Sequence, residues 1–150
     1  MDKRNRAQPT TLLAFGIYLF MLVWIVMWKL HVPFVGRDDM REVKLIPFVS
    51  AQGFGASAPL EVGINILLFV PFGIYLGLLA RSWTAWRVVA VICCVSLSLE
   101  CAQYVLAVGS SDATDVIANT TGGLVGMGLL AIARRALVAL RFRPGAPRAP

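Results

Sequence analysis

The sequence predicts an all-α membrane protein, built as a bundle of about four transmembrane helices. Of its 150 residues, 58% are hydrophobic and only 15% are charged, which is too apolar for an ordinary soluble domain of this size. Four stretches of about 18 to 21 residues carry almost no charge, and a helix of this length crosses roughly 30 Å of hydrocarbon. The predicted spans are about 12–30, 62–80, 88–108 and 116–133.

The first span follows a short basic segment, residues 1–11. Its apolar run is longer than the core of a usual signal peptide, and no small-residue cleavage site follows it before Pro33. We therefore expect an uncleaved anchor. The segment between the first and second spans, 31–61, is too short for a hydrophobic core of its own, so the chain is expected to form one membrane domain over 12–133.

The second and fourth spans carry the residues that allow helices to approach closely. Pro71, Gly73 and Gly77 lie in the second span and favour a kink and a face of small residues. The fourth span contains Gly122-x-x-x-Gly126, a spacing typical of packed membrane helices. This glycine-rich helix is also the predicted contact for a second copy or a partner membrane protein. Residues 134–150 follow as a basic, Pro-rich tail.

The distribution of Lys and Arg predicts the orientation. These residues gather in 1–11, in the turn 81–87 and beyond residue 133, whereas the opposite side carries Arg37, Arg41 and Lys44. Since the basic side stays in the cytoplasm, both termini are expected inside, with the loops at 31–61 and 109–115 outside.

Polar side chains occur at the same end of three spans. Glu100 lies inside the third span, where a carboxylate costs a few kcal/mol and marks a functional site by default. Gln103 projects from nearly the same helix face. Asn65 opens the second span, and Asp115 and Asn119 share one face at the start of the fourth. A shared polar pocket near the external surface is the predicted result.

Structural alternatives remain open for each of these residues. Asp112 or Asp115 could cap the N-terminus of the fourth helix. Asn65, Gln103 and Asn119 could form hydrogen bonds that hold the helices together. Glu100 needs a partner or a bound proton in either case.

The chain resembles the VanZ-like family over roughly residues 45–130. The motifs that carry the resemblance are LIPF at 45–48, NILLFVPFG at 65–73, SLECAQ at 98–103 and DATDVIANTTGG at 112–123. The resemblance implies a multi-pass protein of the bacterial cytoplasmic (inner) membrane, in a family whose founding member is linked to teicoplanin resistance. It does not supply a reaction. By the motifs, the positions carried over are Asn65, Pro71, Glu100, Gln103, Asp112, Asp115, Asn119 and Gly122. Family members commonly carry an Arg shortly before the first of the two acids, and here Gly109-Ser110-Ser111 occupies that stretch.

Three functions fit this pattern. In the first, the protein binds or acts on an amphiphilic cell-envelope molecule, lipid-linked or related to peptidoglycan, at the outer face. The candidate catalytic residues are then Glu100, Asp112 and Asp115, and the candidate substrate-binding residues are Asn65, Gln103, Asn119 and Arg41. The second function is a non-catalytic module that partners an envelope enzyme, and the third is a small transporter subunit. Whether the protein is an enzyme stays open.

The three acids would repel a phosphate unless a cation intervenes. Either a divalent ion such as Mg²⁺ or Ca²⁺ bridges them, or Arg37, Arg41 or Lys44 folds over the site. No dedicated protein metal site and no other cofactor are expected. The chain has a single histidine and no recognised nucleophile or phosphate-cradling motif, so a His-assisted nucleophile is not expected. The basic residues lie where membrane topology explains them, so nucleic acid is not an expected partner. The lipid bilayer is an expected partner.

Overall fold

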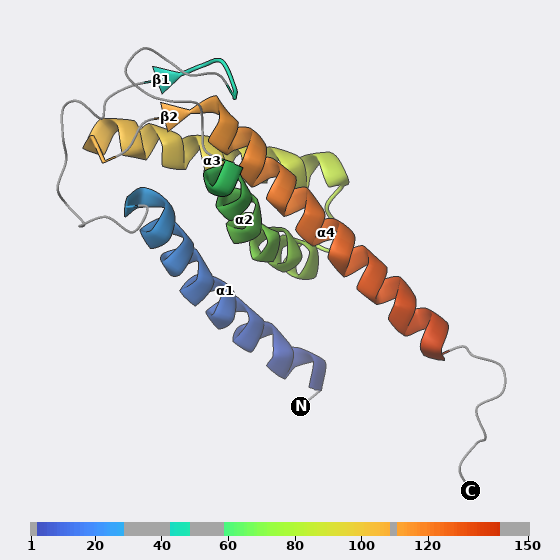
Figure 1. Ribbon diagram of the computed structural model, residues 1–150. Coiled ribbons are helices and arrows are strands. Elements are labelled where there is room, and N and C mark those ends of the chain that lie inside the picture. The colour runs from blue at the N-terminus through green and yellow to red at the C-terminus, as the bar shows by residue number, and fades with distance from the viewer. Residues whose placement is uncertain (1–2, 29–42, 49–58, 109–110, 142–150) are drawn as a thin grey trace, which may run out of the picture.

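The computed structural model describes residues 3–28, 43–48, 59–108 and 111–141. These form four helices and two short strands, shown in chain order in Figure 1. The elements are α1 (Lys3–Trp28), β1 (Val43–Lys44), α2 (Pro59–Leu79), α3 (Ala85–Leu106), β2 (Ser111–Asp112) and α4 (Ala113–Arg141).

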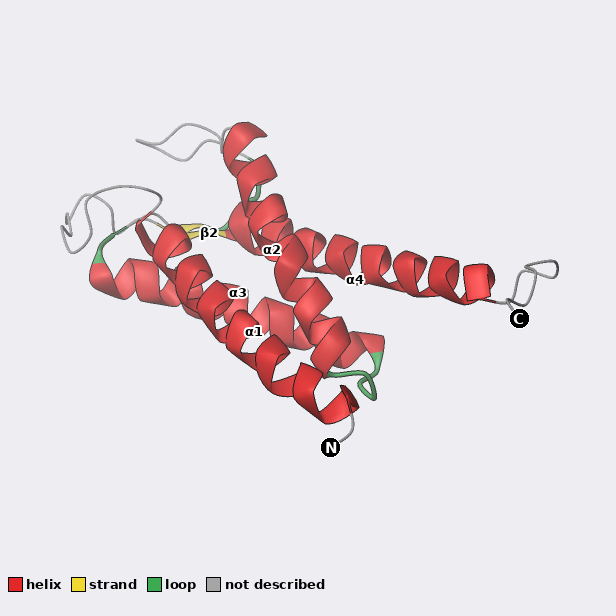
Figure 2. Ribbon diagram, turned by 90° about the horizontal axis from the view of Figure 1, so that it is seen from below, coloured by secondary structure: helices red, strands yellow, loops and turns green. Residues whose placement is uncertain are grey.

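The helices confirm the predicted all-α membrane fold. Each of the four contains a stretch long and apolar enough to cross a membrane. Two helices are longer than the predicted spans. Helix α1 begins at Lys3 rather than near 12, so part of the predicted N-terminal tail is helical, and α4 begins at Ala113 rather than near 116 and continues to Arg141, past 133. Part of the predicted C-terminal tail is therefore also helical, and the last turns of α4 project beyond the other helices in both ribbon views (Figures 1 and 2). The orientation of the bundle in the membrane stays a prediction.

Glycines bring α2 and α4 into backbone contact. A Cβ atom on Gly122 would lie 2.1 Å from the carbonyl oxygen of Ile66, and one on Gly126 would lie 2.0 Å from that of Val70. Gly73 on α2 faces the backbone of α4 in the same way. Because lipid is as apolar as the side chains, membrane helices associate through such close packing rather than through a hydrophobic driving force. The glycine spacing of α4 is thus used within the chain, and docking of a second chain on this helix stays a prediction.

The larger apolar side chains of the core come from the other three helices. The most deeply buried are Leu22 and Met27 on α1, Phe69 and Phe72 on α2, and Val88 and Ile92 on α3. In α4, by contrast, the buried positions are occupied by small or polar residues. The core therefore lies between α1, α2 and α3, and α4 closes it with its small-residue face.

Helix α1 is attached to α2 through aromatic rings. Phe15 packs on Tyr75 and Phe72, with ring centroids 5.1 and 5.9 Å apart, and Tyr18 packs on Tyr75 at 5.6 Å. The Tyr18 hydroxyl also donates a hydrogen bond of 2.6 Å to the carbonyl oxygen of Leu68. This bond joins two segments fifty positions apart in the chain.

Replacing Tyr18 with phenylalanine tests that bond. We expect the free energy of unfolding to fall by about 1 kcal/mol, since the ring packing is kept and one interhelical hydrogen bond is lost. SDS titration of the protein in detergent micelles would measure the change. The matched control is Tyr104→Phe, because Tyr104 is 42% exposed on α3. Equal effects of the two substitutions would show that the Tyr18 bond contributes nothing.

All four helices meet at one end of the bundle, where α1 and α3 end and α2 and α4 begin; we call this the polar end. Helix α3 stops because Ala107 adopts a left-handed conformation with φ 53°, and the Val108 N–H donates to the carbonyl oxygen of Gln103 at 3.1 Å. The chain then turns back through β2, which pairs in parallel with β1, Lys44 opposite Asp112. This pairing places the 43–48 segment beside the start of α4 (Figure 1).

Candidate functional site

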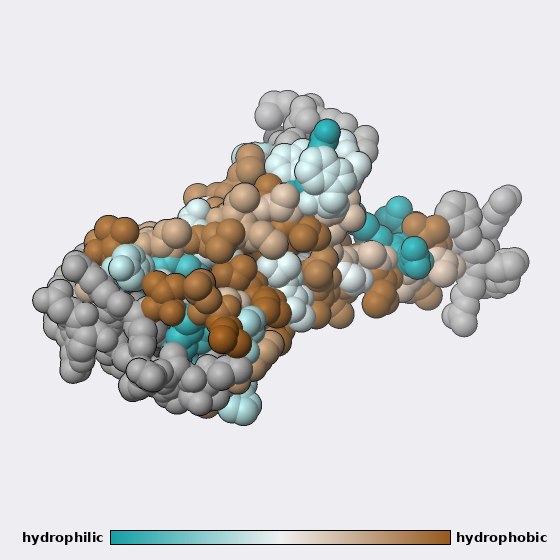
Figure 3. Space-filling model, turned by 90° about the horizontal axis from the view of Figure 1, so that it is seen from above, coloured by the Kyte–Doolittle hydropathy of each residue, from teal (hydrophilic) through white to brown (hydrophobic). Residues whose placement is uncertain are grey.

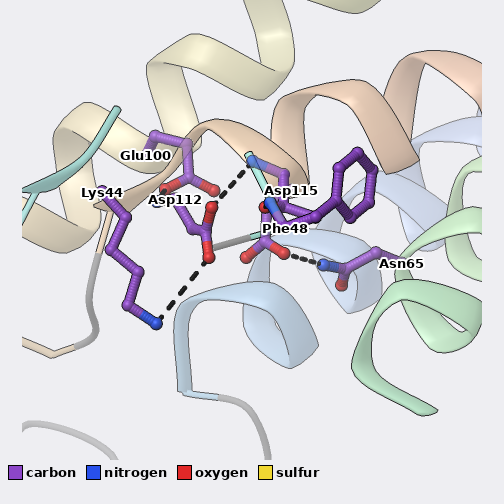
Figure 4. Close-up of polar contacts among 7 residues, drawn as sticks. Lys44, Phe48, Asn65, Glu100, Asp112 and Asp115 are labelled. Carbon is purple, nitrogen blue, oxygen red and sulfur yellow. Dashed lines mark hydrogen bonds and ion pairs between the residues drawn. The ribbon is translucent and has the colours of Figure 1, made fainter. Parts of the chain in front are cut away.

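Glu100 ties the end of α3 to the start of α4. Its Oε2 atom accepts a hydrogen bond of 2.8 Å from the backbone N–H of Asp112. The Ser111 hydroxyl donates a second bond of 2.8 Å to the Glu100 carbonyl oxygen. The Glu100 residue is only 6% exposed, so its carboxylate is held among protein groups rather than in solvent (Figure 4).

Asp112 has two roles at this point. Its Oδ1 atom accepts a hydrogen bond of 2.8 Å from the backbone N–H of Thr114, which makes Asp112 the N-cap of α4. Its Oδ2 atom lies 3.9 Å from the ammonium nitrogen of Lys44. Of the two acids that could cap this helix, Asp112 does so, and its charge faces both the positive end of the helix dipole and a lysine.

The sequence predicted that one of three basic residues would lie over the acids, and Lys44 is the one that the structure places there. It is 8% exposed and lies on β1, directly opposite Asp112 in the strand pairing. Arg37 and Arg41 lie outside the described residues, so the predicted substrate-binding role of Arg41 stays a prediction. We refer below to Lys44, Glu100 and Asp112 as the charged cluster.

The segment that carries Lys44 is joined to β2 by strand pairing and also to α4 by a hydrogen bond. The backbone N–H of Phe48 donates a hydrogen bond of 3.0 Å to the hydroxyl of Thr114, which is fully buried. Phe48 has φ 61°, a conformation that is rare for a bulky residue and that persists only where surrounding contacts fix it. Strain of this kind concentrates at functional sites, so the 43–48 segment is a constrained part of the polar end.

Asp115, in the first turn of α4, pairs across to α2. Its Oδ1 atom accepts a hydrogen bond of 2.6 Å from the side-chain amide of Asn65. Both residues are buried, at 4% and 8% exposure. The predicted approach of Asn65 and Asp115 is therefore realised, immediately beside the charged cluster (Figure 4).

Gln103 and Asn119 make their contacts elsewhere. The Gln103 side-chain amide donates to the carbonyl oxygen of Val26 on α1 at 2.8 Å, and that of Asn119 donates to the Ser96 hydroxyl on α3 at 2.8 Å. Each bond joins two helices, as the structural alternative expected. The Oε1 atom of Gln103 and the Oδ1 atom of Asn119 are buried and accept no hydrogen bond within the part of the chain that the structure describes.

The predicted site residues thus form two adjacent groups. The charged cluster and the pair of Asn65 and Asp115 lie together at the polar end, whereas Gln103 and Asn119 brace the helices around them. Within the described ranges, no three His, Cys, Asp or Glu side chains gather as metal ligands. A bridging divalent cation stays a prediction, and Lys44 supplies the positive charge seen at the acids.

Two hydroxyl residues of the site were not predicted. Ser111 and Thr114 flank the N-cap of α4, and both fix the polar end through hydrogen bonds to α3 and to the 43–48 segment. The sequence signal at this point was Asp112 as an N-cap residue before a helix, and it does not specify the neighbouring hydroxyl residues.

Comparison with known proteins adds a sequence relationship to this geometry. Residues 15–134 match the family model described as VanZ/LLP1. The chain is 31% identical over 122 residues to Protein VanZ of Enterococcus faecium, an alignment that covers 80% of this chain and 73% of that protein. No solved structure matches the chain. The matched range contains the charged cluster and every other polar residue described above.

Proposed function

Because this chain belongs to the VanZ/LLP1 family, we propose that it binds a cell-envelope amphiphile at its polar end and thereby contributes to teicoplanin tolerance. The chain is a multi-pass membrane protein, and the resemblance to the VanZ-like family is what links it to this antibiotic. The bacterial cytoplasmic membrane, with the polar end facing outward, is the location that the proposal requires.

The observation that carries the proposal is the buried charged cluster. Lys44, Glu100 and Asp112 come from three separate elements and converge with 8% exposure or less. Ionised groups at this depth cost free energy, and a bundle of this size could be closed with apolar side chains instead. A polar group arriving at this end would meet an ammonium donor and carboxylate acceptors already held in place.

The contacts favour binding over bond making. Glu100, the candidate general base, already accepts the Asp112 N–H, and Asp112 already caps α4. A general base needs its carboxylate directed at a substrate proton, whereas an acceptor that positions a ligand can share its lone pairs with the backbone. We therefore propose a binding site, with Glu100 as its central acceptor.

Neutralising Glu100 tests this function. The wild type, Glu100→Gln and Glu61→Gln would be expressed at equal membrane levels in a susceptible Gram-positive host that lacks its own copy. We expect the wild type to raise the inhibitory concentration of teicoplanin several-fold and Glu100→Gln to lose most of that rise, because glutamine keeps the shape but removes the charge. Glu61 is the matched control, since it is an exposed acid in the first turn of α2.

Two results would contradict the proposal. If the wild type leaves teicoplanin tolerance unchanged, the resistance function fails for this protein. If Glu100→Gln protects as well as the wild type, the carboxylate is structural and the alternative of a module that partners an envelope enzyme becomes the better account. Vancomycin, measured in parallel, shows whether the effect is specific to one glycopeptide.

A further inference from the structure

A groove of about 570 Å³ opens beside the charged cluster, between α3, α4 and β1. Its walls are mainly apolar and include Leu97, Tyr104 and Val105 on α3, Val116 and Ile117 on α4, and Leu45 beyond β1. The volume falls within the roughly 300 to 1,000 Å³ of typical ligand sites. Figure 3 looks onto this end of the molecule and shows, at its left, teal hydrophilic atoms set between brown apolar surfaces.

The groove opens toward lipid. Leu97, Val105 and Ile117 lie in helices that span the membrane, yet their exposed fractions are 51%, 68% and 44%. Outward-facing side chains of such helices contact hydrocarbon rather than water. The groove is therefore accessible from the hydrocarbon region of the bilayer, where lipid tails lie.

The groove also reaches the polar groups. Glu100, Asp112 and Lys44 contribute to its lining together with the apolar side chains. A chain lying in the groove would hold its polar end at the charged cluster without leaving the bilayer. A groove of this volume is closer in size to one hydrocarbon tail than to two.

We infer that this groove holds the hydrocarbon tail of a single-chain amphiphile whose polar group contacts the charged cluster. The inference rests on the proposed function and adds the ligand class, the route of entry from the bilayer, and the residues that select the tail.

The probe is a single-chain lysophospholipid with a photoactivatable diazirine in its tail, added to the full chain in nanodiscs of phosphatidylglycerol and phosphatidylethanolamine. After illumination, the labelled positions are mapped by mass spectrometry at increasing probe concentration. We expect saturable labelling of 97–105 and 113–117 that exceeds labelling of the lipid-facing part of α4 beyond residue 124 several-fold. Uniform, non-saturating labelling of all outward faces would mean ordinary lipid contact and would overturn the inference.

A matched pair of substitutions locates the tail. Ile117→Trp fills the groove, whereas Leu124→Trp adds the same bulk two helical turns further on the same helix at nearly equal exposure, 44% against 46%. We expect the first to reduce groove labelling several-fold and the second to leave it unchanged. Val105→Trp, on the opposite wall at 68% exposure, repeats the test if Ile117→Trp does not fold. Groove labelling that is unchanged in both filled variants overturns the inference, as does capture of a second copy of the chain on these walls instead of the probe.

The Glu100→Gln variant separates this inference from the proposed function. Its apolar walls are intact but a polar contact of the ligand is lost, so we expect labelling to stay localised on 97–105 and 113–117, to need a higher probe concentration to saturate, and to be accompanied by loss of teicoplanin tolerance. Groove-specific labelling without any tolerance effect would support the tail site and refute the proposed function. Uniform labelling combined with loss of tolerance in Glu100→Gln would do the reverse.

Discussion

Replacing Gly126 with leucine is expected to separate α2 from α4 and to abolish the folded bundle. A Cβ atom at this position would lie 2.0 Å from the carbonyl oxygen of Val70 and 3.1 Å from the backbone nitrogen of Ile74. Carbon–oxygen contacts between helices normally lie at about 3.3 Å or more, and backbone cannot rotate away as a side chain can. We expect a loss of about 3 kcal/mol or more in the free energy of unfolding.

The matched control is Gly128→Leu on the same helix. A Cβ atom on Gly128 would meet no atom within 4 Å in the described structure, so leucine there would project into lipid. We expect Gly126→Leu to reduce folded protein in membranes sharply and Gly128→Leu to leave it unchanged, measured by fluorescence size-exclusion chromatography after detergent extraction. Wild-type behaviour of Gly126→Leu would mean that the two helices do not pack as closely as this structure has them. A shift in oligomer size with Gly128→Leu alone would support the predicted second copy on this helix.

Hydropathy was sufficient to predict the four helices because a membrane span needs a long, uninterrupted apolar run. The ends of the helices were harder to place. The start of α4 depends on the Asp112 carboxylate accepting the Thr114 N–H, and its extension to Arg141 depends on residues with high helix propensity rather than on apolarity. Neither property changes a hydropathy average.

The position of the polar residues along each helix was also predictable, and so was the approach of Asn65 to Asp115, but the other partners were not fixed by the sequence. Helical spacing places Glu100 and Gln103 on one face, yet Gln103 bonds to Val26 because α1 ends beside it. The sequence of α3 contains no information on where α1 ends in space. Lys44 was one of three basic residues expected to cover the acids, and the sequence could not choose among them, since the contact of Lys44 with Asp112 arises from a two-residue strand pairing between segments that lie far apart in the chain.

Replacing Asn65 with leucine is expected to give the second large loss of stability. The Asn65 amide donates the 2.6 Å hydrogen bond to Asp115, and without it a buried carboxylate loses a donor. Hydrogen bonds to charged groups contribute about 1.5 to 3 kcal/mol, so we expect a loss of about 2 kcal/mol, measured by SDS titration in micelles. Ile64→Asn is a useful contrast, since that position is 44% exposed on the same turn and asparagine there would face lipid without a defined partner.

The exchange Asn65→Asp with Asp115→Asn distinguishes a structural bond from a functional charge. The amide and the carboxylate still meet, so most of the stability lost in Asn65→Leu should return, but the negative charge moves from α4 to α2. In α4 that charge lies in the first turn, where the helix dipole favours it, beside Asp112 and Lys44. If the exchanged protein is stable but gives no teicoplanin tolerance, the Asp115 charge belongs to the binding site. If stability and tolerance both return, the pair only joins two helices, and the site is confined to the charged cluster. We expect the exchanged protein to be stable but to give no teicoplanin tolerance, because a ligand that binds the Asp115 carboxylate on α4 would not find that charge on α2.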